Sequence, residues 1–256
     1  MIPFGVLVST EQFDATGLVE FAHALETRGY DSFWLPELFG REPVATAGFL
    51  LGRTQHLKFA TGIANVYVRD ANAMAQARQS LAELSAGRFI LGLGVSNAGL
   101  NTARGHVWQS PLQKMTEYLD ALAKANVAAP APTRPCPTYI AAHGPRLQTL
   151  GATRTDGIIT YLMPPEHTRR SRQQIGATPA LNVVAMFLAE RDPTIARGKA
   201  RAALKIYVRL DYYHREWRKL GFTDADFADG GSDRLIDMLV ACIDQMGSGA
   251  SDGSGC

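Results

Sequence analysis

Short apolar segments alternate along most of the chain with longer segments whose apolar residues recur three and four positions apart. The first pattern is typical of buried strands, and the second is typical of helices with one buried face. Leu18, Phe21, Ala22 and Leu25, for example, follow the helical spacing. Apolar strands that alternate with helices in this way indicate a parallel sheet covered by helices, so the predicted fold class is α/β.

The pattern predicts both the elements and their grouping. Strands are expected at residues 4–8, 32–35, 57–64, 88–93, 138–142, 157–161 and 181–188. Helices are expected over 15–28, 43–51, 72–85, 193–220 and 232–246, with further helices beginning at Pro111 and Pro145. Residues 1–246 are predicted to form one domain, with 192–246 as its helical C-terminal region and 247–256 as a flexible polar tail. No eighth apolar strand is found.

Charge and composition narrow the class of protein. The chain has 256 residues, with 26 basic and 24 acidic side chains. A balance of this kind produces no broad field to recruit nucleic acid or a membrane. Three cysteines give neither metal-ligand spacing nor a disulfide framework, and no segment resembles a signal peptide or a membrane span. We therefore expect a soluble cytoplasmic protein without a metal; secretion is the minor alternative.

The ends of the predicted strands hold few conventional catalytic groups. Ligands of parallel α/β proteins collect at the carboxyl ends of the strands. The polar candidates there are Glu37, Asn97 and His143. Each has a structural alternative, because Glu37 fits a strand-end carboxylate and His143 fits a helix cap. Such an edge suits an organic cofactor that carries its own reactivity.

The strand at 88–93 leads into a turn of small residues, Gly94 to Asn97. Small residues let backbone N–H groups approach a flat, phosphate-bearing ligand. Gly92 and Gly94 are not a dinucleotide fingerprint, because no third glycine follows at the required spacing.

Five blocks in order resemble the bacterial luciferase-like oxidoreductases, most closely the branch assigned to coenzyme F420. The blocks are GYDSFWLPE (29–37), ATGIANVYVRD (60–70), LAELSAGRFILGLGVSNA (81–98), ARGHVWQSPLQKMTEYLDAL (103–122) and PTYIAAHGPRLQTLGATRTDGIITYLMPPEH (137–167). The resemblance implies a TIM-like (β/α)8 barrel with the cofactor at its C-terminal rim. Because no eighth strand is found, we expect the last strand to be missing and the barrel to be open or incomplete.

The resemblance also implies the residues of the cofactor site. It implies a non-proline cis peptide at Gly62–Ile63. The residues that match the cofactor-binding segments are Gly62, Ile63, Ala64, Gly94, Val95, Ser96, Asn97, Ala142, His143, Gly144, Pro145, Arg146, Thr160 and Tyr161.

The expected reaction is hydride transfer between coenzyme F420, a deazaflavin, and a small organic substrate. The alternatives are an FMN-dependent monooxygenase that uses reduced flavin and oxygen, and a barrel that binds flavin without reacting. Glu37, Asn97 and His143 are the candidate catalytic residues. Relatives often carry a histidine or an acid at the position of Asn97, and asparagine cannot exchange a proton near neutral pH. If that position is the proton donor, the chemistry of this chain is either weakened or moved to Glu37 or His143. Because the family often forms dimers, a homodimer is one expected state.

Overall fold

The computed structural model describes residues 3–242. It divides into two compact units. Unit 1 comprises Met1–Ala142 and Arg146–Ile159, and unit 2 comprises His143–Pro145 and Thr160–Cys256. Each unit is described by itself. The predicted tail at 247–256 lies outside the described residues, and the single domain over 1–246 stays a prediction.

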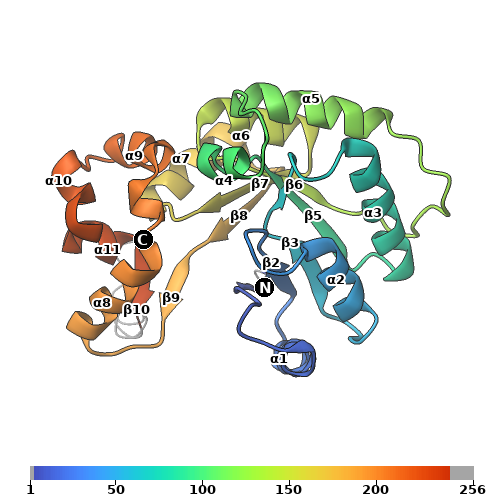
Figure 1. Ribbon diagram of the computed structural model, residues 1–256, viewed down its shortest axis with the longest axis horizontal. Helices are drawn as coiled ribbons and strands as arrows, with labels where there is room; N and C mark the ends of the chain where they lie inside the picture. Colours follow the sequence, from blue (N-terminus) through green and yellow to red (C-terminus); the bar gives the residue numbers. More distant parts are fainter. Residues whose placement is uncertain (1–2, 243–256) are drawn as a thin grey trace. The chain divides into compact units, whose positions relative to one another are not determined.

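Unit 1 is built on a parallel sheet (Figure 1). Its strands are β1 (Gly5–Leu7), β2 (Ser32–Leu35), β3 (Lys58–Thr61), β4 (Ala64–Asn65), β5 (Phe89–Gly94), β6 (Thr138–Ala141) and the first residues of β7 (Gly157–Tyr161). The order of the whole sheet is β1-β2-β3-β5-β6-β7-β8, with β4 paired to β5. β1 and β8 are therefore the two ends of this path. The register pairs Phe33 with Phe59 and Phe59 with Phe89, and all three rings are fully buried.

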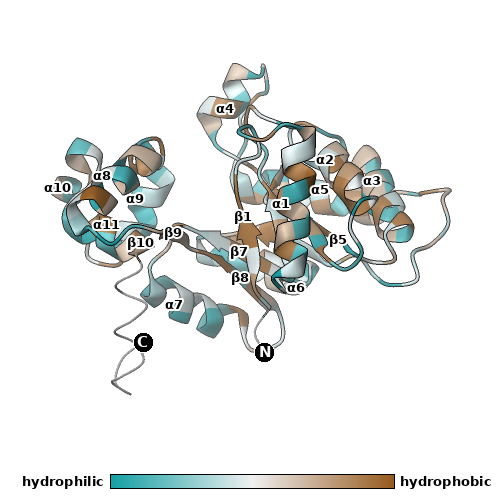
Figure 2. Cartoon of the chain, turned by 90° about the horizontal axis from the view of Figure 1, so that it is seen from below, coloured by the Kyte–Doolittle hydropathy of each residue, from teal (hydrophilic) through white to brown (hydrophobic). Residues whose placement is uncertain are grey.

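Helices follow the strands of unit 1. They are α1 (Ala15–Thr27), α2 (Pro43–Leu51), α3 (Ala71–Leu84), α4 (Ala98–Ala103), α5 (Pro111–Lys124) and α6 (Pro145–Arg154), whose first residue belongs to unit 2. Local sequence sets where they begin. Asp14 Oδ1 accepts the Gly17 N–H at 2.7 Å, Asp70 caps α3 in the same way, and Pro111 occupies the first turn of α5. In Figure 2 the strands are mostly apolar, whereas the helices carry both apolar and polar residues.

Unit 2 has its own core. Its strands are β8 (Ala180–Val184), β9 (Met186–Leu188) and β10 (Val240–Cys242), together with the end of β7. Its helical elements are α7 (Pro165–Ile175), α8 (Pro193–Leu204), η1 (Tyr207–Arg209), α9 (Asp211–Arg218), α10 (Asp224–Phe227), η2 (Ala228–Gly230) and α11 (Asp233–Leu239). Trp217, Leu204 and Leu235 are fully buried at the centre of this core. The Trp217 indole N–H donates to the Leu162 carbonyl at 3.1 Å.

The helix predicted over 232–246 is wrong at its end, because α11 stops at Leu239. Val240 has extended backbone angles and starts β10, which runs parallel to β9 with Val240 opposite Met186. The sequence does not predict this strand, because its three residues are too few to show a period. Residues 243–246 lie outside the described part of the chain.

Three further predicted elements are interrupted. The strand predicted over 181–188 divides at Ala185 into β8 and β9. The helix predicted over 193–220 breaks after Leu204 into η1 and α9. Aromatic and β-branched residues at 206–208 favour helix less than the alanine-rich segment before them. The strand predicted over 57–64 divides at Gly62–Ile63, where β3 ends before β4 begins. The short helix α4 was not predicted.

Candidate functional site

The Glu37 carboxylate lies just beyond the end of β2 and is buried. Its two oxygens accept hydrogen bonds from the Arg69 guanidinium at 2.8 and 2.9 Å. Oε2 also accepts the backbone N–H of Asn65 at 2.7 Å. Arg69 contacts the Glu42 carboxylate as well. Burial disfavours the charged guanidinium, but its hydrogen bonds and the negative charges of Glu37 and Glu42 outweigh that effect and raise the pKa of Arg69.

Two buried asparagines connect the end of β4 to the turn after β5. Asn65 Nδ2 donates to Asn101 Oδ1 at 2.8 Å. Asn101 Nδ2 in turn donates to the carbonyls of Val95 at 2.8 Å and Asn97 at 3.1 Å. Buried amide groups without partners are costly, so this fully bonded pair holds the turn in one conformation.

The turn from Gly94 to Asn97 leads directly into α4. Ser96 adopts a left-handed backbone conformation with φ +58°. Asn97 is the N-cap of α4, and its Oδ1 accepts the Leu100 N–H at 2.9 Å. The Asn97 side-chain oxygen therefore has a structural task at this helix start.

The peptide bond between Gly62 and Ile63 is cis, as the resemblance implied. The Ile63 side chain packs against Gly94, where an added Cβ would lie 2.5 Å from Ile63 Cδ1. Ala64 follows and pairs with Leu93 in the ladder between β4 and β5. The ends of β3, β4 and β5 thus form a closely packed, largely apolar surface in unit 1.

His143 belongs to unit 2, where aromatic side chains surround it. Its Nε2 accepts the backbone N–H of Tyr161 at 3.3 Å, so the proton of the neutral ring is on Nδ1. Its carbonyl oxygen lies 3.0 Å from His167 Nε2, and its ring stacks on Tyr212. Burial, with a smaller contribution from nearby His167, lowers the pKa of His143 to about 3. The imidazole is therefore neutral at physiological pH.

Four tyrosines share this part of unit 2: Tyr161, Tyr207, Tyr212 and Tyr213. Burial raises the pKa of Tyr212 to about 12, and it raises the pKa values of Tyr161 and Tyr213 as well. Thr160 is fully buried, and its Oγ1 has no hydrogen-bond partner within residues 3–242. This hydroxyl therefore has bonding capacity for a ligand.

The remaining predicted residues lie at the start of α6. Ala142, in unit 1, is buried and donates its N–H to the Ile159 carbonyl at 3.0 Å. Gly144 and Pro145 belong to unit 2, whereas Arg146 is exposed in unit 1. The structure therefore groups the predicted residues into one set in each unit.

Sequence reasoning missed several residues that hold these sets in place. Arg69, Asn65 and Asn101 were not candidates, although Asn101 follows Asn97 by one helical turn and so points back toward the same turn. Tyr212 and Tyr213 were not candidates either, because the sequence predicted only a long helical region over 193–220. Within residues 3–242, no helix has the length and apolar character to cross a membrane.

Comparison with curated proteins adds evidence from relatives. The chain is 27% identical over 177 residues to 5,10-methylenetetrahydromethanopterin reductase from Methanolobus tindarius, covering 62% of this chain and 54% of that protein. It is 28% identical over 191 residues to F420-dependent glucose-6-phosphate dehydrogenase from Amycolatopsis mediterranei, covering 62% and 57%. The chain thus spans little more than half the length of these curated relatives.

Solved structures support the fold. An F420-dependent secondary alcohol dehydrogenase in complex with an F420–acetone adduct superposes with a TM-score of 0.72 at 17% identity, over 93% of this chain and 84% of that one. This similarity confirms the predicted TIM-like barrel class, and among the described strands β1 and β8 each pair with only one neighbour in the sheet. The family model described as luciferase-like monooxygenase matches residues 1–231. The chain therefore belongs to the luciferase-like monooxygenase family.

Proposed function

We propose that this chain is an oxidoreductase that transfers a hydride between coenzyme F420 and a small organic substrate. The observation that carries the proposal is the apolar surface of Ile63 and Gly94 in unit 1, together with a Glu37 carboxylate whose two oxygens are both hydrogen-bonded to Arg69. Such a surface can hold a flat ring by shape, and with Glu37 engaged by Arg69 the reactivity is best supplied by the cofactor. The name of the curated relative from Amycolatopsis mediterranei, an F420-dependent glucose-6-phosphate dehydrogenase, supports F420 as that cofactor.

The packed surface of unit 1 fits a flat cofactor ring. The absence of a Cβ at Gly94 lets Ile63 pack directly on the backbone there. When bound, F420 supplies a ring carbon that accepts or donates a hydride.

The three candidate catalytic residues take different roles in this proposal. Glu37 orients Arg69 and the Asn65 backbone, so it is a positioning residue. Asn97 holds the start of α4 and offers its amide N–H groups to a ligand. His143 is neutral and, with its Nε2 bonded to the Tyr161 backbone, orients the end of β7.

A fluorescence titration tests the proposal. We expect the protein to bind F420 with a dissociation constant of about 10 μM or lower, in the range common for enzyme ligands. Gly94→Ala should weaken binding about tenfold or more, because the new Cβ displaces Ile63. Gly198→Ala is the matched control, since nothing lies within 4 Å of its added Cβ.

The outcomes separate the candidate functions. Tight FMN binding with oxygen consumption by the reduced flavin would replace the proposal with an FMN-dependent monooxygenase. Binding of F420 without turnover of any alcohol, aldehyde or imine substrate would favour a non-catalytic barrel. If neither F420 nor FMN binds, the oxidoreductase assignment is wrong.

A further inference from the structure

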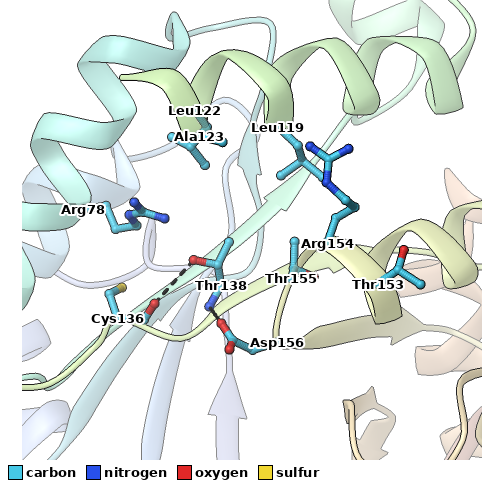
Figure 3. Close-up of a pocket in the computed structure, with 10 residues that line it drawn as sticks. All are labelled: Arg78, Leu119, Leu122, Ala123, Cys136, Thr138, Thr153, Arg154, Thr155 and Asp156. Carbon is cyan, nitrogen blue, oxygen red and sulfur yellow. Dashed lines mark hydrogen bonds between the residues drawn. The ribbon is translucent and has the colours of Figure 1, made fainter. Parts of the chain in front are cut away.

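A cavity of about 410 Å³ lies in unit 1 at the amino ends of β6 and β7. This is the end of the sheet opposite to the strand ends considered above, so the cavity is separate from the proposed cofactor site. Its volume falls within the range of small-molecule pockets. Its lining residues are Arg78, Leu119, Leu122, Ala123, Cys136, Thr138, Thr153, Arg154, Thr155 and Asp156 (Figure 3).

One wall is apolar and comes from the last turns of α5. Leu119, Leu122 and Ala123 stand along it, opposite Thr138 and Asp156 (Figure 3). Leu119 and Leu122 are mostly buried, whereas Ala123 is exposed. An apolar group placed against α5 would therefore contact Ala123 and the small exposed parts of the two leucines.

The two arginines that line the cavity differ in whether an acidic side chain offsets their charge. Arg154 Nη2 is paired with Asp120 Oδ1 at 2.6 Å, which offsets its charge. Arg78, from α3, makes no ion pair or hydrogen bond with its side chain in the part of the chain that the structure describes. Figure 3 places the two guanidinium groups on opposite sides of the cavity. Arg78 is therefore the cation available to a ligand.

The floor of the cavity limits how negative a ligand can be. Asp156 Oδ2 accepts the Thr138 N–H at 2.7 Å. The Cys136 thiol donates to the Phe89 carbonyl at 3.3 Å. Burial raises the pKa of this thiol to about 12, so Cys136 stays neutral and does not compete with a ligand for Arg78. One unpaired cation with a carboxylate nearby favours a ligand with a single negative charge.

We propose that this cavity binds a small organic monocarboxylate, with its carboxylate on Arg78 and its apolar body against Leu119, Leu122 and Ala123. A planar guanidinium binds a carboxylate through two parallel hydrogen bonds, and the leucines remove the apolar body from water. This binding site goes beyond the proposed redox function and needs no bound cofactor.

Calorimetric titration of the full chain with benzoate tests the proposal. We expect saturable binding of benzoate, about tenfold weaker binding of the neutral isostere benzamide, and weaker binding of the dianion phthalate. Arg78→Gln should weaken benzoate binding about tenfold. Lys124→Gln is the matched control, because it removes an exposed charge at the end of α5 outside the lining.

A second variant separates loss of binding from loss of fold. Ala123→Trp fills the cavity from an exposed position, so the circular dichroism spectrum should match the wild type while benzoate binding is lost. The proposal is overturned if benzoate does not saturate, if benzamide binds equally well, or if Arg78→Gln and Ala123→Trp both bind benzoate like the wild type.

Discussion

At the scale of single residues, the Glu37 carboxylate, a candidate catalytic acid, stabilises the structure through its hydrogen bonds. Both of its oxygens accept hydrogen bonds from Arg69, and one also accepts the Asn65 N–H. The sequence identified Glu37 as a polar residue after a strand but left its role open. Its partners lie 28 and 32 residues further along the chain, and no local pattern predicts such a pairing.

Glu37→Gln should destabilise the protein by about 3 kcal/mol, because it leaves the half-buried Arg69 charge without its main partner. Urea unfolding followed by circular dichroism measures this change. Asp120→Asn is the control, because the ion pair between Asp120 and Arg154 is exposed. The urea midpoint of this variant should barely differ from that of the wild type. Equal midpoints for Glu37→Gln and the wild type would refute the structural role.

His143 is a second residue whose environment decides its chemistry. Burial, aided by His167, lowers its pKa from the ordinary 6.5 to about 3. Between these values the unfolded chain binds a proton that the folded protein does not. The unfolding free energy should therefore fall as pH decreases from about 6.5 toward 3, by at most about 1.4 kcal/mol per pH unit for this group.

Urea midpoints measured between pH 7.5 and 5 check this pH dependence. His143→Gln should flatten the slope even if it lowers stability at every pH. His56→Gln, at an exposed position, should retain the wild-type slope. A slope unchanged by His143→Gln would show that another group carries the acid sensitivity.

At the scale of elements, α4 shows what periodicity can and cannot detect. The strand at Ser32–Leu35 and the helix that begins at Pro111 were predicted correctly, because apolar spacing and proline mark them locally. The helix α4 has six residues, too short for a period. Its position depends on Asn97 at its N-cap and on Asn101, which bonds to the turn before it.

Asn101→Ala should lower the unfolding free energy by about 2 kcal/mol, because it strips hydrogen bonds from the buried Asn65 amide and the Val95 carbonyl. Thr102→Ala, on the exposed face of the same helix, is the control and should have little effect. Chemical denaturation provides the comparison. Matching midpoints for the two variants would mean that the asparagine pair does not stabilise the turn.

At the scale of the whole molecule, the described chain has two compact units. The phenylalanines of β2, β3 and β5 lie at the centre of unit 1, and the cluster around Trp217 fills unit 2. The sequence showed a change of pattern after residue 190, but it did not show that a separate core begins at Thr160. That boundary falls within β7, a single continuous strand, so no break between elements marks it in the sequence.

Leu235→Ala should destabilise unit 2 by about 3 kcal/mol, because a fully buried leucine leaves a cavity in that core. Hydrogen exchange by mass spectrometry should show faster exchange in α9 and α11 than in β2 and β3 of the same variant. Met238→Ala, on the same helix but exposed, is the control. Equal acceleration in both units would mean that they unfold together.

The sequence by itself determined the α/β class and most strands and helices of unit 1, and its resemblance to the family located the cis bond at Gly62–Ile63. Each of these is encoded in local order: apolar periodicity, helix caps, and motifs in a fixed sequence. Only the tertiary structure decided that Arg69 neutralises Glu37, that tyrosines enclose His143, and that Arg78 lines a cavity without an ion-pair partner among the described residues. These pairings join residues far apart in the chain, so packing, and not local propensity, selects them.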